Sequence, residues 1–378
     1  MAMDRLFQLM KEKNASDMFF AVNSPVHIKI NGNLIPINQH KLEPENIHSL
    51  LSEICTPEQM AELENENELN MGVSVPNLGR FRLSAFRQRG SISAVFRFVP
   101  ANIPPLGELG LPPVLAELIM EKRGLLLLVG ATGSGKSTTI AAMLDHRNEQ
   151  KTGHILTLED PIEYLFKNKK SIVNQREIGA DAKSFYTALK NSMRQAPDCI
   201  LIGEIRDKET MAAALAYAQS GHLVLATLHA NNSYNALNRI ISFYPIENRA
   251  ALLQDLSSSV KAIVSQRLVR SAGGGPRHAA VEIMVNTRYI ADLIEKGSIG
   301  EIKEAMEKSL SPGSQTFETA LYNLVKEGKV AQEEAIANAD SATNLLWLLN
   351  NGPEKKQEES QPDAQPDGAS FTEFTLNT

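Results

Sequence analysis

Several kinds of residue are scarce in this chain of 378 residues. Only Cys55 and Cys199 are cysteines, and they lie far apart in the sequence. Two such thiols exclude a disulfide-rich scaffold, and we expect buried free thiols in a reducing compartment. Long hydrophobic runs are also missing, because no stretch reaches the roughly 18 apolar residues that a membrane span needs.

Excess positive charge is absent too. The net charge is −6 with a pI near 5.8, which argues against a protein that binds nucleic acid through bulk electrostatics. Residues 1–13 alternate charged and apolar side chains and lack the apolar core of a signal peptide. We therefore expect a cytoplasmic protein with no transmembrane segment, held peripherally at a membrane only by a partner.

The length predicts two or three domains. Residues 1–100 show short alternating strands and a hairpin signal at residues 31–32, which indicate a small α/β module. Residues 101–113 are rich in Pro and Gly and indicate an interdomain linker. Residues 114–349 form the second predicted domain. The polar segment 350–378 has few hydrophobic residues, so we expect a disordered tail.

The second domain alternates short apolar strands with helical stretches. The expected strands are residues 125–129, 154–158, 200–202, 223–226 and 281–285. Such strands, joined by helical crossovers, predict a parallel sheet covered on both faces. Beyond residue 242 the pattern is mostly helical, including one long stretch expected at 250–269.

The most informative motif follows the first of these strands and opens a stretch compatible with a helix. It matches the phosphate-binding pattern G-x-x-x-x-G-K-[ST]. The residues that we expect at the nucleotide are Gly130, Thr132, Gly133, Ser134, Gly135, Lys136, Ser137 and Thr138. Glycines let backbone N–H groups surround phosphate oxygens at a helix N-terminus. Lys136 can reach the β and γ phosphates, and the Ser137 hydroxyl can bind Mg²⁺.

Two other strands end in carboxylates. The stretch DCILIGE ends at Glu204, and LTLEDPIEY places Glu163 beyond another strand. Ligands bind at the carboxyl ends of strands in open α/β sheets. We favour Glu204 at the metal, partly through water, and Glu163 as the base that positions the attacking water. The sequence leaves the order of these two roles open.

A further strand carries two histidines. In SGHLVLATLHA, His222 begins the strand and His229 follows its end. We expect His229 to sense the γ-phosphate. We expect His222 at the nucleotide site as well, bonded across to the acidic segment. The spacing of the two histidines does not favour a metal site.

Arginines form the last candidate set. Ring ATPases often place an arginine from a neighbouring subunit against the charge of the transition state. The candidates that we assign to the nucleotide site are Arg80, Arg82, Arg97 and Arg123, while Arg194, Arg206 and Arg239 are further arginines in the second domain. Which of them act from a neighbouring subunit stays open.

Taken together, GATGSGKST, TLEDPIEY, ILIGEIRD and SGHLVLATLHANNS resemble the four nucleotide boxes of the secretion ATPase superfamily in order and spacing. The segments GRFRLSAFRQRG, SMRQAPD, LVRSAGGGPRHAAVEIMVNT and QTFETALYNLVKEGKV resemble type IV pilus retraction ATPases of the PilT/PilU type. The resemblance extends from residue 1 to about residue 349. It implies a two-domain α/β protomer, with a PAS-like α+β N-terminal domain. A RecA-like P-loop domain with a mainly parallel sheet and a helical C-terminal part follows. It also implies a homohexamer with ATP between the domains.

Two features refine the resemblance. Pilus-extension and type II secretion relatives usually carry a tetracysteine zinc module, which two cysteines cannot form. Principal retraction motors carry a basic AIRNLIR-like segment after VNT, whereas this chain has RYIADLIE there. That departure, with residues 322–324 and 338–342, resembles the accessory PilU branch. The implied partners are a principal retraction ATPase and the inner-membrane platform protein of the pilus, with no direct nucleic-acid partner.

The resulting hypothesis is a hexameric ATPase that uses ATP and Mg²⁺ and assists retraction of type IV pili in twitching motility. Two alternatives stay open from sequence. One is a non-catalytic, nucleotide-bound ring that stabilises the principal motor. The other is a RecA-like nucleic-acid translocase, because fold does not fix function.

Overall fold

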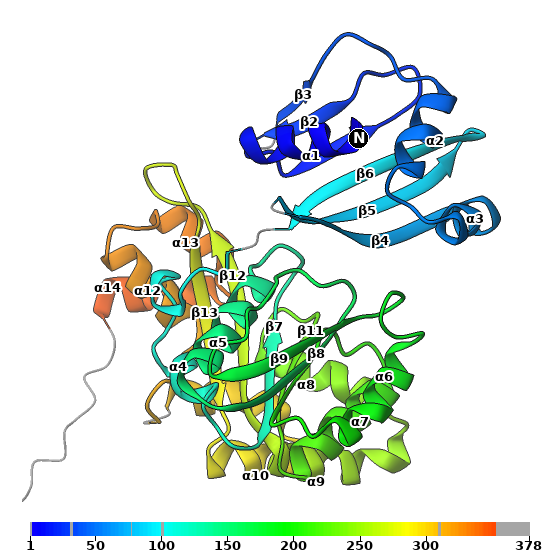
Figure 1. The fold of residues 1–378 in the computed structure, drawn as a ribbon. Coiled ribbons are helices and arrows are strands. Elements are labelled where there is room, and N and C mark those ends of the chain that lie inside the picture. Colours follow the sequence, from blue (N-terminus) through cyan, green and yellow to red (C-terminus); the bar gives the residue numbers. More distant parts are fainter. Residues whose placement is uncertain (1, 31–32, 77, 100–101, 309–310, 353–378) are drawn as a thin grey trace, which may run out of the picture.

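The computed structural model describes residues 2–30, 33–76, 78–99, 102–308 and 311–352. Figure 1 shows a smaller N-terminal domain above a larger domain, each built around its own sheet. The predicted disordered tail lies outside the described residues from residue 353 onward. Within the described part of the chain, no helix is both long and apolar enough to cross a membrane.

The N-terminal domain covers one face of an antiparallel sheet with helices. Its elements are α1 (Ala2–Glu12), β1 (Asp17–Phe20), β2 (His27–Ile30), β3 (Asn33–Pro36), α2 (Pro44–Ser52), α3 (Pro57–Glu66), β4 (Glu68–Val75), β5 (Gly79–Gln88) and β6 (Ser91–Val99). The strand order is β3-β2-β1-β6-β5-β4. Phe7 of α1 stacks on Phe81 of β5 at 4.2 Å between ring centroids and packs edge-on against Phe96 of β6. These buried rings fix the helix on the sheet.

The larger domain contains a mainly parallel sheet of seven strands in the order β13-β12-β7-β11-β10-β8-β9. The strands are β7 (Gly124–Val129), β8 (Gly153–Glu159), β9 (Ser171–Glu177), β10 (Cys199–Ile202), β11 (Leu223–Leu228), β12 (Val260–Val269) and β13 (His278–Val285). Only β13 pairs antiparallel. Leu125 and Leu127 of β7 join one hydrophobic cluster, while Leu126 and Leu128 join another. Successive side chains of this strand therefore face opposite layers, as the sequence predicts.

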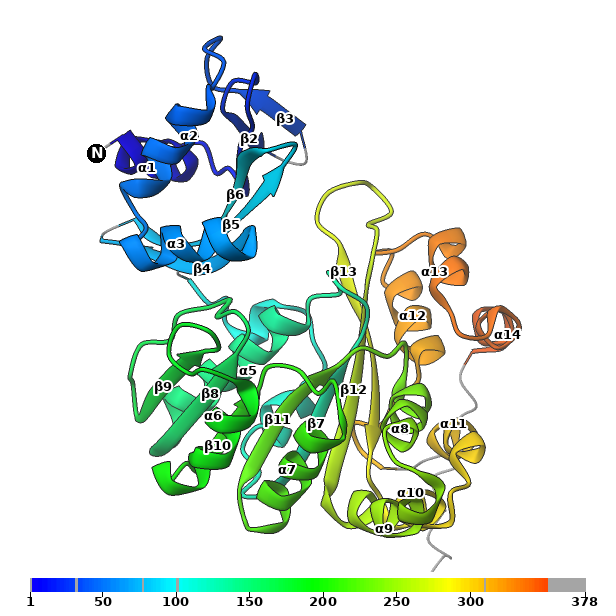
Figure 2. The same ribbon diagram turned by 90° about the vertical axis from the view of Figure 1, so that its right-hand side faces the viewer.

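Helices flank this sheet on both sides, which Figure 2 shows from a second direction. They are η1 (Leu106–Glu108), α4 (Val114–Leu118), α5 (Lys136–Gln150), α6 (Phe185–Ser192), η2 (Met193–Gln195), α7 (Lys208–Gln219), α8 (Ser233–Ser242), η3 (Ile246–Asn248), α9 (Arg249–Ser259), α10 (Arg288–Lys296), η4 (Ile299–Glu301) and α11 (Ile302–Glu307). The C-terminal helices are α12 (Phe317–Lys326), α13 (Gln332–Asn338) and α14 (Ala342–Asn351). Phe317, Leu321 and Leu345 of these helices form a separate cluster with Val269 and Ala280 of the last two strands.

The structure corrects the long helix expected at residues 250–269. Helix α9 ends at Ser259, and Val260 turns directly into β12 without a loop. Most of β12 is buried on both faces, so its apolar run lacks the alternation that distinguishes a strand from a helix. Strand β9, at the edge of the sheet, was not predicted either, since it carries polar residues at several positions.

Candidate active site

The phosphate loop joins β7 to α5. Strand β7 is buried throughout, and Gly130, Gly133 and Gly135 follow it with positive φ angles of 152°, 78° and 91°. A Cβ atom on Gly130 would lie 2.5 Å from the Ser134 hydroxyl oxygen and 2.6 Å from the backbone oxygen of Gln266. This position therefore requires glycine both for its backbone conformation and for space.

Lys136 begins α5 and folds back over the loop. Its Nζ donates to the backbone oxygens of Gly130, at 2.8 Å, and Ala131, at 2.9 Å. Burial lowers the pKa of Lys136, and the carboxylates of Glu204 and Glu163 act in the opposite direction. The ammonium group is thus positioned beside the loop with two carboxylates in its electrostatic surroundings.

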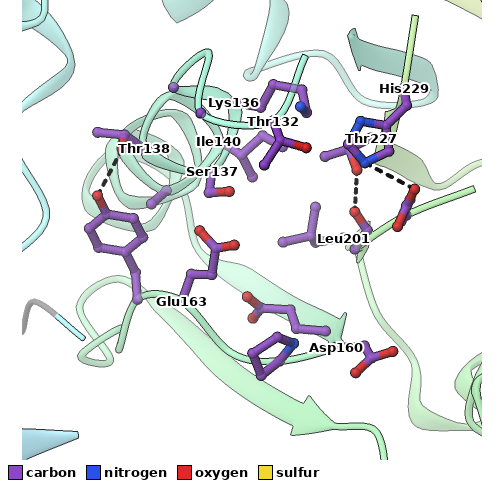
Figure 3. Close-up of a pocket in the computed structure, with 18 of the residues that line it drawn as sticks. Thr132, Lys136, Ser137, Thr138, Ile140, Asp160, Glu163, Leu201, Thr227 and His229 are labelled. Atoms are coloured by element: carbon purple, nitrogen blue, oxygen red, sulfur yellow. Dashed lines mark hydrogen bonds and ion pairs between the residues drawn. The ribbon is translucent and has the colours of Figure 1, made fainter. Parts of the chain in front are cut away.

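A cavity of 860 Å³ opens beside this loop, and Figure 3 shows residues that line it. The predicted site residues that line it are Arg82, Arg97, Thr132, Gly133, Gly135, Lys136, Ser137, Thr138, Glu163, Glu204 and His229. They come from the phosphate loop, from segments after three strands of the parallel sheet, and from the N-terminal domain. The cavity therefore lies between the two domains, at the carboxyl ends of β7, β8, β10 and β11.

Glu204 lies between the side chains of Arg206 and His229, just beyond the end of β10. Its Oε2 accepts from Nε of Arg206 at 2.6 Å, and its Oε1 lies 3.2 Å from Nε2 of His229. Nη1 of Arg206 also lies 3.7 Å from Oδ2 of Asp160, and the carboxylate hydrogen bond to Glu204 raises the pKa of Arg206. This network fixes the Glu204 carboxylate while leaving its side chain 22% exposed.

The acidic turn, residues 159–163 at the end of β8, contains carboxylates in contrasting surroundings. Glu159 is buried and accepts from the Thr157 hydroxyl at 2.7 Å and from Nε2 of Gln175 at 3.2 Å, and burial raises its pKa. Glu163 is exposed, and Figure 3 shows its carboxylate directed into the cavity toward Ser137. Both carboxylates line the cavity, and Glu163 is the more exposed of the two.

Arg82 and Arg97 project into the cavity from the N-terminal domain. They are directly paired across β5 and β6, and like charges placed directly opposite each other destabilise a sheet. Nε of Arg97 donates to the Asp17 carboxylate at 2.8 Å. The pair therefore provides positive charge opposite the phosphate loop.

The structure corrects the positions expected for five other residues. His222 and Arg123 lie where β11 and β7 begin, at the opposite end of the sheet from the phosphate loop. The His222 ring contacts the Ser220 hydroxyl and the Tyr217 backbone oxygen rather than the acidic segment. Arg80 does not line the cavity, because its guanidinium donates to Glu177. Gly130 and Ser134 shape the phosphate loop from beneath rather than lining the cavity.

Sequence reasoning missed several residues of this site. Arg277 lines the cavity from the β12–β13 connection, and the preceding glycine run at 273–275 was the available signal. Arg206 stood among the arginines considered but was not assigned to the site. The Tyr164 hydroxyl lies 2.8 Å from the Thr138 hydroxyl and connects the acidic turn to α5. No sequence signal indicated that connection.

Comparisons with known proteins agree with this geometry. Residues 2–336 match the family described as Type II/IV secretion system protein. The type IV pilus ATPase PilU of Pseudomonas aeruginosa is 46% identical over 94% of this chain and 93% of its own length. The pilus retraction ATPase PilT of the same organism is 38% identical over 91% of this chain and 100% of its own length.

Solved structures show the same relationship. A crystal structure of the pilus retraction motor PilT with bound ADP has a TM-score of 0.84 and 37% identity, covering 90% of this chain and 99% of that one. The Legionella pneumophila ATPase DotB has a TM-score of 0.79 and 27% identity, covering 90% and 96%. The predicted α/β fold, nucleotide binding and ATPase class are thereby confirmed. The chain is a P-loop ATPase that belongs to the Type II/IV secretion system protein family, and within it to the type IV pilus ATPases of the PilT/PilU type.

Proposed function

We propose that this ATPase hydrolyses ATP with Mg²⁺ to assist retraction of type IV pili, working as a homohexamer together with a principal retraction ATPase. The observation that carries the proposal is the convergence of Lys136, Glu163, Glu204 and His229 on one interdomain cavity. The names of the relatives, a PilU pilus ATPase and a PilT retraction ATPase, support the pilus as the object of the work.

Each of these residues has a role that its position supports. The phosphate loop and Lys136 bind the β and γ phosphates, since backbone N–H groups and an ammonium group meet there. Glu163 positions the attacking water, because its carboxylate is exposed in the cavity. His229, 3.2 Å from Glu204, senses whether the γ-phosphate is present. Arg82 and Arg97 supply positive charge from the N-terminal domain. Nucleotide bound between the two domains would therefore draw the domains together.

The donor set fits Mg²⁺. The Ser137 hydroxyl and the Glu204 carboxylate line the same cavity, and both are oxygen ligands of the kind that Mg²⁺ prefers. A phosphate-bound Mg²⁺ needs only one or two protein ligands, since phosphates and water complete its shell. When bound, the ion would neutralise charge that develops on the phosphates. Ser137 would hold it directly and Glu204 partly through water.

Assembly and location belong to the same proposal. A cavity formed by two domains can couple nucleotide hydrolysis to a change in their relative orientation, and a ring can pass such changes from one subunit to the next. We propose a cytoplasmic hexamer, peripheral at the inner membrane, where it meets the pilus platform protein. The two domains with a boundary at residues 101–113 would be the moving parts.

The proposal is tested by complementation. A strain that lacks this gene is supplied with the wild type, Glu204→Ala or Glu204→Gln, and pilus retraction is scored by twitching and by fluorescently labelled pili. We expect both variants to fail to restore retraction, although each is present at the same level as the wild-type protein. Normal retraction with Glu204→Ala would overturn the proposal and support the non-catalytic ring. ATPase activity of the pure protein that rises with added DNA would instead indicate a nucleic-acid translocase.

A further inference from the structure

Arg80 forms an ion pair that joins the two domains at the acidic turn. Its Nη2 lies 2.6 Å from Oε2 of Glu177, although the two residues are 97 positions apart. Their side chains are 15% and 4% exposed, respectively. Glu177 ends β9 in the larger domain, and Arg80 lies on β5 of the N-terminal domain. Because both groups are largely buried, either one left alone would be costly.

Gly72 of the neighbouring strand β4 provides the space for this contact. A Cβ atom there would lie 2.1 Å from Nη2 of Arg80 and 2.5 Å from its Cζ. The φ angle of Gly72 is not in the positive range that favours glycine. Glycine at this position is therefore explained by the guanidinium that passes over it, and it provides a second, independent means of disturbing the contact.

The same carboxylate oxygen also holds the acidic turn. Oε2 of Glu177 accepts from the backbone N–H of Ile162 at 2.9 Å, and Ile162 directly precedes Glu163. The backbone of Glu177 is itself fixed, because its N–H donates to Asp181 at 2.8 Å and it pairs with Glu159 in the sheet. One oxygen atom thus receives a hydrogen bond from each domain.

We propose that Arg80 and Glu177 are positioning residues that make the placement of Glu163 depend on the orientation of the N-terminal domain. With Arg80 engaged, the Glu177 carboxylate is neutralised and holds the N–H of Ile162. When the N-terminal domain swings away, the buried carboxylate loses its cation and must rehydrate or move, which loosens the turn. This inference rests on the proposed role of Glu163 in water positioning.

The test compares kcat for ATP hydrolysis with nucleotide affinity in the purified full-length protein. We expect Arg80→Ala to lower kcat by roughly tenfold to a hundredfold, because a small misplacement of a reacting group has that effect. The dissociation constant for a fluorescent ATP analogue should change by less than about threefold, since Arg80 does not line the cavity. The kcat of Arg80→Lys should lie between those of the wild type and Arg80→Ala. Arg87→Ala, an exposed arginine on the same strand, should match the wild type.

Gly72→Ala provides the matched second variant. It should lower kcat when Arg80 is present, because the added Cβ atom clashes with the guanidinium. It should have no additional effect in Arg80→Ala, because alanine at position 80 removes that clash. In a Glu163→Gln background, Arg80→Ala should likewise change kcat by less than about twofold, since both changes act on one group. Thermal unfolding of every variant shows that the comparison is made on folded protein.

The outcomes separate the two proposals. Unchanged turnover in Glu163→Gln alone would overturn the role of Glu163 and with it this inference. If Glu163→Gln is inactive but Arg80→Ala keeps wild-type kcat, the role of Glu163 stands and the positioning pair is refuted. A loss of affinity equal to the loss of kcat in Arg80→Ala would also refute it, because Arg80 would then act on bound nucleotide.

Discussion

Arg267 of β12 connects the C-terminal helices to the loop that carries His229, and its removal should destabilise the larger domain. Its guanidinium lies 3.9 Å from the centre of the Phe317 ring. It donates to the backbone oxygens of Asn338 and, at 3.1 Å, Asn231, and it pairs with Asp340. A single side chain therefore links α12, the end of α13 and the segment after β11.

The size of the effect follows from these contacts. A desolvated cation–π contact contributes about 2 kcal/mol. Removing one partner of a buried ion pair, so that the other charge is left unpaired, costs about 3–5 kcal/mol. We lower that figure to about 1–2 kcal/mol, because Asp340 keeps hydrogen bonds from Asn232 at 2.8 Å and Tyr234 at 3.2 Å. The free energy of unfolding should therefore fall by about 3–4 kcal/mol in Arg267→Ala, which lowers Tm by about 6–16 °C in a domain of this size.

Scanning calorimetry of the purified protein measures this shift. Arg270→Ala is the matched control, since Arg270 is exposed and lies three residues further along the chain. It should leave Tm within about 1 °C of the wild type. A decrease below about 2 °C in Arg267→Ala, or an equal decrease in the control, would refute the reasoning.

Three other predictions follow from single residues. Burial raises the pKa of Glu282, so its contribution to stability is present below its unfolded pKa and lost as pH rises through the raised value. Glu282→Gln should therefore be more stable than the wild type at about pH 8 but not at about pH 4. Thermal unfolding measures both, and an equal gain in stability at the two pH values would contradict this. Tyr164→Phe removes the contact with Thr138 and should raise KM for ATP roughly twofold to tenfold. An unchanged KM would show that the contact is irrelevant to nucleotide binding. Gly130→Ala places Cβ 2.5 Å from the Ser134 hydroxyl and should abolish binding of a fluorescent ATP analogue, whereas wild-type affinity would contradict the loop geometry.

Local patterns explain why the phosphate loop could be predicted. Its glycines, Lys136 and Ser137 lie within one strand–turn–helix unit, so sequence spacing alone determines their proximity. The convergence of Glu163, Glu204 and His229 was also predictable, because the carboxyl ends of parallel strands meet at one edge of the sheet. The same rule, applied consistently, places His222 and Arg123 at the opposite edge, where the structure has them.

Contacts between distant segments could not be predicted in this way. Arg80 alternates with its neighbours on β5 like Arg82, and only the three-dimensional arrangement sends one to Glu177 and the other to the cavity. Strand β12 was missed because burial on both faces hides its period. Arg277 required knowledge of where the β12–β13 connection folds, because the glycine run before it indicates a turn but not what that turn approaches.

The central claim is that the interdomain cavity hydrolyses ATP through the phosphate loop and the carboxylates opposite it. The most direct test is phosphate release by the purified protein with ATP and Mg²⁺, alone and with the partner motor, for the wild type, Lys136→Ala and Glu204→Ala. We predict that the wild type releases phosphate and that the turnover of both variants is lower by about a hundredfold or more. Full turnover in either variant, or none in the wild type with nucleotide still bound, would contradict the account.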